Sequence, residues 1–381
     1  MRVQLLGTGS SDGWPNPWCG CVSCRSAADA GIVRGQSSAL LDGRLLLEIG
    51  PEAPRSALRH GLDLTGIEAV LVTHAHPDHH GWPAWMWRGW VRGRRPLTLV
   101  APPAVIEEAS HSVDDTVTVV PVSAGDEVSV AGYQVRVLPA NHAEPTVGPA
   151  VLYDLTGADG ARLLWATDTG PLPEAMLDLV AGRSYDAVLL ELTGVPTPHH
   201  LTLSSWPLQV AELRRRGAIA ETTRLMAVHM GHDNPPPAEL QAILTGWGAH
   251  APVDGEVVEL GPHPTSPAPP VPRRVLVLGG ARSGKSTYAE RRLAAEPDVT
   301  YVATAPPAED DAEWRERVQA HRDRRPVGWR TVETADVVPL LRQPPGALLV
   351  DDLGLWLTCV VDAADAWDGP LPAWERSSTR R

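Results

Sequence analysis

The chain has 381 residues, of which 43% are hydrophobic and 21% charged, and its formal net charge is −13. This length and composition predict a globular protein with two domains. The negative balance excludes a general role in coating nucleic acids, which requires clustered lysine and arginine. The N-terminal stretch MRVQLLGTGSS enters a strand without a basic and apolar leader, and no apolar run reaches transmembrane length. We therefore expect a cytoplasmic protein with no membrane partner.

The first unusual segment along the chain is PNPWCGCVSCRSA, which places Cys19, Cys21 and Cys24 within six residues. Only one further cysteine exists, Cys359, and it lies near the opposite end of the chain. Disulfide frameworks use an even number of cysteines spread over a small secreted domain. Thiolates at C-x-C-x-x-C spacing are instead typical of metal ligands, and a tetrahedral zinc then needs a fourth ligand from elsewhere. The alternative is three unrelated free thiols.

The strongest motif is LVTHAHPDHHG, in which an expected buried strand over 69–73 is followed at once by His74, His76, Asp78 and His79. Imidazole and carboxylate groups at this spacing can surround two metal ions, because alternate side chains reach different ions. Two ions about 3.5–4 Å apart can clamp a phosphoryl group and activate a water molecule. The alternative, a polar loop with solvated histidines, does not explain so specific a pattern.

Four tryptophans follow directly in the stretch GWPAWMWRGW, at Trp82, Trp85, Trp87 and Trp90. Such side chains stack on a nucleobase or line a corrin-sized ligand in some proteins. More often an aromatic stripe belongs to the hydrophobic core, and the sequence leaves both interpretations open.

The histidine motif resembles that of the metallo-β-lactamase fold family, whose later ligands can be sought along the chain. Three segments that follow expected strands, LPANHAEP, LLWATDTGP and LMAVHMGHDN, supply His142, Asp168 and His229. The resemblance implies an αββα sandwich with a dinuclear site bridged by Asp168. One ion is then held by His74, His76, His142 and Asp168, and the other by Asp78, His79, Asp168 and His229. His and Asp sites accept zinc or manganese, so the sequence does not fix the metal.

One branch of this family, the cyclic phosphodiesterases of the carbon–phosphorus lyase pathway, is similar in two further features. It has a C-x-C-x-x-C loop after its first GTG turn and a final H-x-x-H, and those residues hold a structural zinc. The matching residues of this chain are Cys19, Cys21, Cys24 and His232. The resemblance also implies that His200, in TPHHLTL, donates a proton to the leaving group, with the adjacent His199 as the less favoured candidate. The expected substrate is a small-molecule phosphodiester.

A domain boundary is expected at GPHPTSPAPPVPRR, where prolines recur without apolar periodicity. We therefore place a metal-dependent hydrolase domain at 1–261, a proline-rich linker at 262–273 and a second domain at 274–381. The second domain opens with RRVLVLGGARSGKSTYAE, in which an expected strand, a glycine loop and a helix follow one another. The loop matches G-x-x-x-x-G-K-[ST] and predicts a phosphate site formed by Gly279, Gly280, Ala281, Arg282, Ser283, Gly284, Lys285 and Ser286.

This loop predicts binding of GTP or ATP together with Mg²⁺. Its backbone N–H groups cradle phosphates at the start of a helix, while Lys285 reaches the terminal phosphates and Ser286 holds Mg²⁺. Asp351, which follows another expected buried strand in ALLVDD, is suited to face the same Mg²⁺.

Beyond the loop, VTYVATA, WRERVQAHRDRRPVGWRTVE and ALLVDDLGLWLT resemble the bifunctional adenosylcobinamide kinase and adenosylcobinamide-phosphate guanylyltransferase of cobalamin synthesis. The resemblance implies that adenosylcobinamide is a partner and that His321 accepts GMP covalently. Asp352 and Gly354 depart from the family pattern DCLTLWL. The likeness covers about residues 274–367, so we expect a partial P-loop NTPase-like α/β domain, incomplete at its C-terminus.

Two functions remain for the whole chain. The first is a phosphodiesterase fused to a kinase and guanylyltransferase-like domain that acts in cobalamin assembly. The second is a phosphodiesterase alone, with a vestigial P-loop module that has no catalytic role. The sequence does not determine the oligomeric state.

Overall fold

The computed structural model describes residues 1–144, 147–261, 274–280, 283–304, 325–326, 328–342, 346–363, 365 and 367. The chain divides into two units, Met1–Arg273 and Arg274–Arg381. The expected linker 262–273 and the site residues Ala281, Arg282 and His321 lie outside the described residues. None of the helices within the described ranges is both long enough and apolar enough to cross a membrane.

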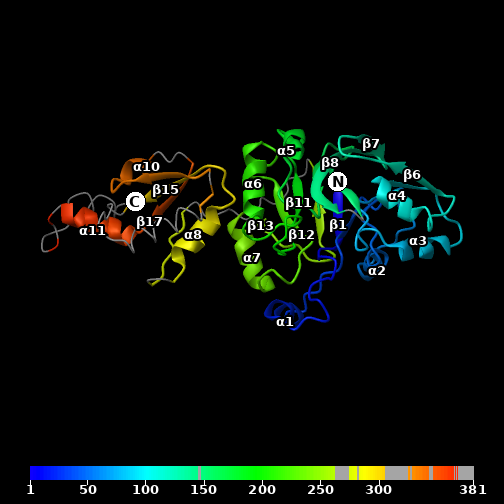
Figure 1. Ribbon diagram of the computed structural model, residues 1–381, viewed down its shortest axis with the longest axis horizontal. Coiled ribbons are helices and arrows are strands. Elements are labelled where there is room, and N and C mark those ends of the chain that lie inside the picture. The colour runs from blue at the N-terminus through cyan, green and yellow to red at the C-terminus, as the bar shows by residue number, and fades with distance from the viewer. Residues whose placement is uncertain are drawn as a thin grey trace. The chain divides into compact units, whose positions relative to one another are not determined.

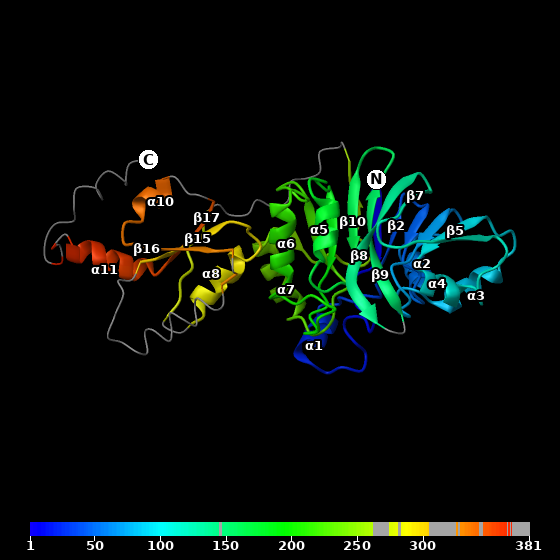
Figure 2. The same cartoon turned by 45° about the horizontal axis from the view of Figure 1, so that its top comes forward.

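Two seven-stranded sheets lie face to face in the first unit (Figures 1 and 2). The first sheet has the order β14-β1-β2-β3-β4-β5-β6, and the second has the order β13-β12-β11-β10-β9-β8-β7. The strands of the first are β1 (Arg2–Gly7), β2 (Ser38–Leu41), β3 (Leu45–Leu47), β4 (Ala69–Leu71), β5 (Leu97–Ala101), β6 (Val117–Pro121) and β14 (Val257–Glu259). Those of the second are β7 (Glu127–Val130), β8 (Tyr133–Glu144), β9 (Gly148–Thr156), β10 (Arg162–Ala166), β11 (Ala187–Glu191), β12 (Arg224–Val228) and β13 (Ala249–His250).

Helices cover the outer faces of both sheets, so the expected αββα sandwich is confirmed (Figure 2). The helices of this unit are α1 (Val22–Asp29), α2 (Ala53–Arg59), α3 (Trp82–Gly89), α4 (Pro103–Ala109), α5 (Glu174–Val180), α6 (Trp206–Arg215) and α7 (Pro237–Gly246). The first sheet is covered by α2, α3 and α4, and the second by α5, α6 and α7.

The main apolar core fills the space between the two sheets. Along β1, Val3 and Leu5 face this core, whereas Leu6 faces the cluster under the helices of the first sheet. The alternation follows from the two-residue period of a strand. From the second sheet, Trp165 reaches the inter-sheet core and is fully buried. The core therefore holds both sheets at a fixed separation and fixes the positions of the loops at their ends.

The tryptophan-rich stretch is divided between the core and the surface. Trp85 is buried in the cluster between the first sheet and its helices. Trp82 and Trp90 are 61% and 71% exposed, and the guanidinium of Arg55 stacks on the Trp87 ring at 5.4 Å from its centroid. The core interpretation thus holds for Trp85 and fails for the two exposed rings.

In both sheets, the loops of the candidate site follow the carboxyl ends of parallel strands. β4 pairs in parallel with β3 and β5, and β11 pairs in parallel with β10 and β12. The carboxyl ends of parallel strands meet at one edge of a sheet, which is where open α/β sheets place their ligands. The residues that follow β4, β10, β11 and β12 therefore come close together.

The second unit has a parallel three-stranded sheet of order β16-β15-β17. Its elements are α8 (Lys285–Leu293), β15 (Val299–Ala303), β16 (Arg330–Glu333), α10 (Val338–Arg342), β17 (Ala347–Asp351) and α11 (Leu353–Ala363). This arrangement agrees with the expected P-loop-like α/β class.

The prediction of a strand before the glycine loop is wrong. Residues 274–280 pair with no strand in the described part of the unit. Val275, Leu276 and Leu278 are 48%, 65% and 81% exposed. An apolar run becomes a strand only where a neighbouring strand accepts its hydrogen bonds, and this condition cannot be seen in the run itself.

Candidate metal centres

The loop after β4 brings four predicted ligands together within a few residues. Thr73 N–H donates to Glu48 Oε2 at 3.1 Å, which fixes the chain where the strand ends. The N–H groups of His79 and His80 then both donate to the carbonyl oxygen of His76, at 3.0 and 2.9 Å. These bonds turn the chain back on itself, so that the side chains of the motif converge.

The first group consists of three imidazoles, and β8 of the second sheet supplies one of them, His142. His74 Nε2 is 2.9 Å from His76 Nδ1, and His142 Nε2 is 3.2 Å from the same atom. His142 was expected after its strand but lies inside β8, where the pairing with β9 shifts register between Pro139 and Ala143. An irregularity of this kind re-aims a strand side chain, which is how a residue within a strand reaches the site.

The second group is centred on Asp168, which follows β10. His79 Nε2 lies 2.6 Å from Asp168 Oδ2 and 3.0 Å from Asp78 Oδ2. His229 Nε2 lies 3.1 Å from the other carboxylate oxygen, Asp168 Oδ1. Asp168 also shares a group of donor atoms within 4.8 Å with His74. Its carboxylate is thus within reach of both groups.

The residues present fit two divalent ions. Asp78 Oδ2, His79 Nε2 and Asp168 Oδ2 are buried, and they approach one another without forming aligned hydrogen bonds within the described part of the chain. Buried polar atoms without partners are costly, and nitrogen and oxygen donors that converge in this way match the ligand set of a divalent ion. Burial also holds the pKa of His74 well below its usual value, which favours the neutral ring that a metal requires.

Three residues around these groups have left-handed backbone conformations, with φ of 60° at Glu48, 48° at Asp168 and 53° at His229. Residues other than glycine rarely adopt such angles and pay a conformational cost for them. Each of the three lies just after a strand, where the chain turns sharply. The surrounding sheet therefore imposes the positions of these side chains.

Two buried carboxylates beside the site were not found by sequence reasoning. Glu48 accepts hydrogen bonds from Thr73 N–H and from Trp165 Nε1, the latter at 2.9 Å, and lies 3.4 Å from His79 Nδ1. A carboxylate on the far nitrogen of an imidazole fixes the orientation of the ring. The signal was present in LLLEIG, where a charged residue interrupts a buried apolar run.

The second missed carboxylate, Glu191, ends β11 and contacts the predicted proton donor. Glu191 Oε1 is 2.9 Å from His200 Nδ1, and its other oxygen accepts the Thr193 hydroxyl at 2.5 Å. Burial lowers the pKa of His200, but the hydrogen bond and charge of Glu191 outweigh it, and the pKa is raised above its ordinary value. The neighbouring His199 contributes its backbone carbonyl, 3.2 Å from His142 Nδ1.

A cavity of about 370 Å³ opens over these residues. His76, Asp78, Asp168, His200 and His229 line it, and so does His232. The predicted proton donor and the metal-ligand groups therefore face one common space, large enough for a small molecule.

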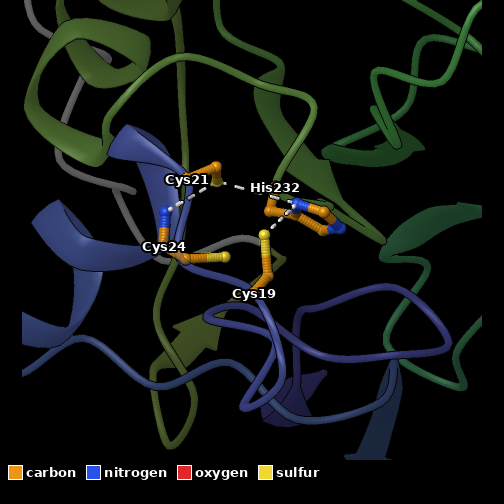
Figure 3. A group of neighbouring side chains, drawn as sticks. All are labelled: Cys19, Cys21, Cys24 and His232. Carbon is orange, nitrogen blue, oxygen red and sulfur yellow. Dashed lines mark hydrogen bonds between the residues drawn. The ribbon is translucent and has the colours of Figure 1, made fainter.

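The side chains of the cysteine loop and of His232 converge, as Figure 3 shows, and His232 also lines this cavity. His232 Nδ1 is 3.4 Å from Cys19 Sγ and 3.8 Å from Cys21 Sγ. The N–H of Cys24 bonds to Cys21 Sγ at 3.3 Å, and this bond, with smaller contributions from His232 and the other two thiols, lowers the pKa of the Cys21 thiol to about 6. Burial raises the pKa of Cys24 to about 12, although a coordinated metal ion deprotonates a thiol outright. The four donors lie within 4.8 Å of one another and fit a tetrahedral ion.

The predicted phosphate loop of the second unit leads into α8. Gly284, with φ of 83°, precedes Lys285 at the start of the helix, and this left-handed angle favours glycine. Ser286 Oγ donates to Asp351 Oδ1 at 3.2 Å, so the two predicted Mg²⁺-facing residues are adjacent. Lys285 Nζ is 3.5 Å from the carbonyl oxygen of Gly280. The hydroxyl of Tyr301 bonds to the other oxygen of Asp351.

Each of the two units matches a known protein family. Residues 44–232 match the beta-lactamase superfamily domain, and residues 275–380 match the family of cobinamide kinase and cobinamide phosphate guanyltransferase. The chain joins one domain of each family. Both family resemblances seen in the sequence are thereby confirmed. The fold of the β-lactamase superfamily domain implies divalent metal binding, which the donor groups described above fit.

Individual relatives cover only part of the chain. The bifunctional adenosylcobalamin biosynthesis protein CobP of Pseudomonas aeruginosa is 52% identical over 91 residues, which is 22% of this chain and 51% of that protein. This chain thus spans about half the length of that curated relative.

Two solved structures resemble the β-lactamase superfamily domain. A diphosphatase from the PhnP family is 25% identical with a TM-score of 0.53, and the match covers 68% of this chain and 97% of that one. The zinc-bound PqqB of Methylobacterium extorquens is 22% identical with a TM-score of 0.56, and the match covers 68% of this chain and 100% of that one.

Proposed function

We propose that the β-lactamase superfamily domain, residues 1–261, cleaves small-molecule phosphodiesters with two divalent ions. The observation that carries the proposal is Asp168, whose carboxylate lies within reach of both groups of imidazoles. One ion is assigned to His74, His76, His142 and Asp168, and the other to Asp78, His79, Asp168 and His229. Zinc or manganese bound there supplies Lewis-acid stabilisation of phosphoryl oxygens and lowers the pKa of water.

His200 is the proposed general acid of this reaction. Its Nδ1 faces Glu191 at 2.9 Å, so the proton for the leaving oxygen comes from Nε2. The raised pKa of His200 keeps the ring protonated over a wider range of pH. After transfer, the neutral ring retains the Nδ1 proton on the side of Glu191. Such a donor matters most for alkoxide leaving groups, which depart poorly until they are protonated.

We assign a structural zinc to Cys19, Cys21, Cys24 and His232. The first three come from the loop before α1 and from its first turn, and His232 comes from the loop after β12. A zinc ion at this point ties the N-terminal loop to the loop that also carries His229. Its proposed role is to hold one side of the cavity in place.

For the second domain, residues 274–381, we propose Mg²⁺-dependent binding of GTP or ATP. The hydrogen bond between Ser286 and Asp351 supports this proposal, since both residues face Mg²⁺ in P-loop proteins. The match of residues 275–380 to the family of cobinamide kinase and cobinamide phosphate guanyltransferase supports phosphorylation of adenosylcobinamide and guanylylation of the resulting phosphate. The resemblance seen in the sequence implies that His321 is the GMP acceptor. We further propose that residues 262–273 are a linker and that the protein serves cobalamin synthesis in the cytoplasm.

The hydrolase proposal is tested with the purified full-length chain, its metal content and a series of phosphodiesters with different leaving groups. We expect two divalent ions in addition to the zinc at the cysteines, and turnover of the diesters. His200→Ala should retain the metals and lose the most activity on substrates whose leaving group has a high pKa. Equal losses on nitrophenolate and alkoxide leaving groups would overturn the assignment of His200.

The second domain is tested by nucleotide binding and by transfer on the same protein. We expect GTP or ATP to bind only with Mg²⁺, and labelled GMP to become attached to the protein but not to the His321→Ala variant. Binding without phosphorylation of adenosylcobinamide or GMP transfer would instead identify a vestigial module. The hydrolase would then be the only catalyst in the chain.

A further inference from the structure

Asp12 contacts His232 of the cysteine site and has no part in the reaction proposed for the dinuclear site. Asp12 Oδ2 is 3.3 Å from His232 Nε2, while Nδ1 of the same ring faces Cys19 Sγ at 3.4 Å. The two nitrogens of one imidazole therefore face a carboxylate on one side and the thiols on the other. Both Asp12 and His232 also line the cavity.

The carboxylate of Asp12 is held in place by its own neighbours. Ser10 Oγ donates to Asp12 Oδ1 at 2.9 Å, and Asn16 Nδ2 donates to Asp12 Oδ2 at 2.6 Å. Both oxygens thus have a donor before the imidazole is counted. The position of the carboxylate is therefore determined by the loop between β1 and α1 and does not depend on His232.

The loop that carries Asp12 is attached to the loop that carries His232. Ser10 N–H donates to the Met230 carbonyl and Met230 N–H donates to the Thr8 carbonyl, both at 3.1 Å. Gly231 allows this approach, because a Cβ there would lie 2.9 Å from the Thr193 carbonyl oxygen and 3.1 Å from Ser10 Oγ. Asp12 and His232 are consequently fixed relative to each other by backbone contacts as well as by their side chains.

We propose that Asp12 is a positioning residue for the cysteine site, where it fixes the orientation of the His232 ring. Because Asp12 and His232 both line the cavity, the cysteine site then also holds part of the cavity wall in place. The proposal rests on the zinc assigned above to Cys19, Cys21, Cys24 and His232. A carboxylate on the far nitrogen of a metal-bound imidazole fixes the ring and raises its basicity, and its loss typically costs about 10- to 100-fold in metal affinity. Asp12 holds Nδ1 of His232 toward the thiols in this way.

The test uses the full-length protein loaded with Co²⁺ and follows release of the metal to excess EDTA. Absorption by thiolate-to-cobalt charge transfer reports the cysteine site alone, because none of the ligands assigned to the dinuclear site is a thiol. Asp12→Ala should release this cobalt about 10- to 100-fold faster and shift the absorption spectrum. Asp12→Asn should restore part of the retention, since its amide oxygen still faces His232 but carries no charge.

Asp233→Asn is the matched control. Asp233 follows His232 directly and lines the same cavity, so the variant removes one negative charge from the same wall. It leaves the contact between Asp12 and His232 intact, and release should stay within about twofold of the native rate. Asn16→Ala, which removes one donor to Asp12, should accelerate release less than Asp12→Ala does, and it provides a second variant if Asp12→Ala does not fold.

Three outcomes would contradict the proposal. Release from Asp12→Ala at the native rate would show that the carboxylate does not support His232. Equal acceleration of cobalt release in Asp12→Asn and Asp233→Asn would show that the negative charge of the cavity wall controls metal retention, and not the contact between Asp12 and His232. If the native protein lacked the charge-transfer absorption, the assigned zinc site itself would be wrong, which separates failure of that assignment from failure of the role of Asp12.

Discussion

The two candidate sites differ in how their residues are distributed along the chain. The dinuclear site combines the loop after β4 with His142 in β8 and with Asp168 and His229, which follow β10 and β12 of the other sheet. The phosphate loop is continuous in sequence over 279–286, and among the contacts described here only Asp351 comes from a distant strand. The first site therefore depends on the whole αββα fold, whereas the second depends mainly on the local path of the chain.

Burial follows the same division. His74, His79, Asp168 and His229 are almost fully buried, so their geometry is fixed by packing on all sides. The glycines of the phosphate loop and Lys285 are exposed or half-exposed, as a loop that must surround a ligand has to be. Changes in the first unit are thus expected to affect several functions together, while changes in the second should affect nucleotide binding alone.

The largest expected effect comes from Asp168→Ala, which removes the carboxylate shared by both metal groups. Phosphodiesterase activity should fall by about 10³-fold or more, on the scale of losing a central electrostatic group of an active site. The measurements are kcat on a diester and bound metal per chain. The exposed Asp115 offers a control, since Asp115→Ala should retain both. A variant of Asp168 with a tenth of the native activity would show that the site does not depend on this bridge.

Lys285→Ala tests whether the second site is independent. Loss of a hydrogen bond from a charged donor costs about 1.5–3 kcal/mol, so nucleotide affinity should fall by roughly 10- to 150-fold. Calorimetric titration with Mg²⁺ and GTP or ATP measures this change. Diesterase activity on the same sample should remain within about twofold of the native value. A parallel loss of both activities would contradict the separation of the two sites.

Cys21→Ser separates the cysteine site from the dinuclear site within the first unit. We expect one zinc fewer per chain and an unfolding midpoint lower by about 5 °C or more, because a structural zinc contributes directly to folding. Cys359→Ser is the matched control, since Cys359 lies in α11 of the second unit and should change neither quantity. Unchanged zinc content in Cys21→Ser would exclude Cys21 as a ligand.

How far the sequence predicts these sites depends on how local each signal is. The motif from His74 to His79 is continuous, and the sandwich fold could be inferred from it through the family resemblance. The bridge at Asp168 required that resemblance, because an aspartate after a strand has no distinctive pattern of its own. Glu191 was missed for the same reason: its role is defined by His200, which is brought to it by the fold.

Two further differences concern strands. His142 lies within β8 and not after it, at a point where the pairing with β9 shifts register. This shift depends on the partner strand β9 as well as on the sequence around His142. Residues 274–280 have the composition of a strand but no partner among the described strands. In both cases the deciding hydrogen bonds are made by a distant part of the chain, which is why a local pattern was not sufficient.

The smallest expected effect is that of Glu191→Gln, which acts on His200, nine residues further along the chain. The hydrogen bond and charge of Glu191 raise the pKa of His200 against the opposing effect of burial. The acid form of His200 is the active one, so activity is present below this pKa and is lost as pH rises through it. Replacing the carboxylate by an amide lowers the pKa, and the alkaline limb of the kcat profile should therefore move to lower pH.

At a pH where His200 is protonated in both the native protein and Glu191→Gln, the variant should lose less kcat than the roughly 10²-fold that a general acid contributes at minimum. Glu212→Gln serves as the control, because Glu212 forms ion pairs with Arg215 at the end of α6 and with Arg216 just after it, and not with His200. Its profile should coincide with that of the native protein. An alkaline limb that stays in place in Glu191→Gln would mean that another group supplies the proton. The geometry around Glu191 would then serve only to hold the loop that follows β11.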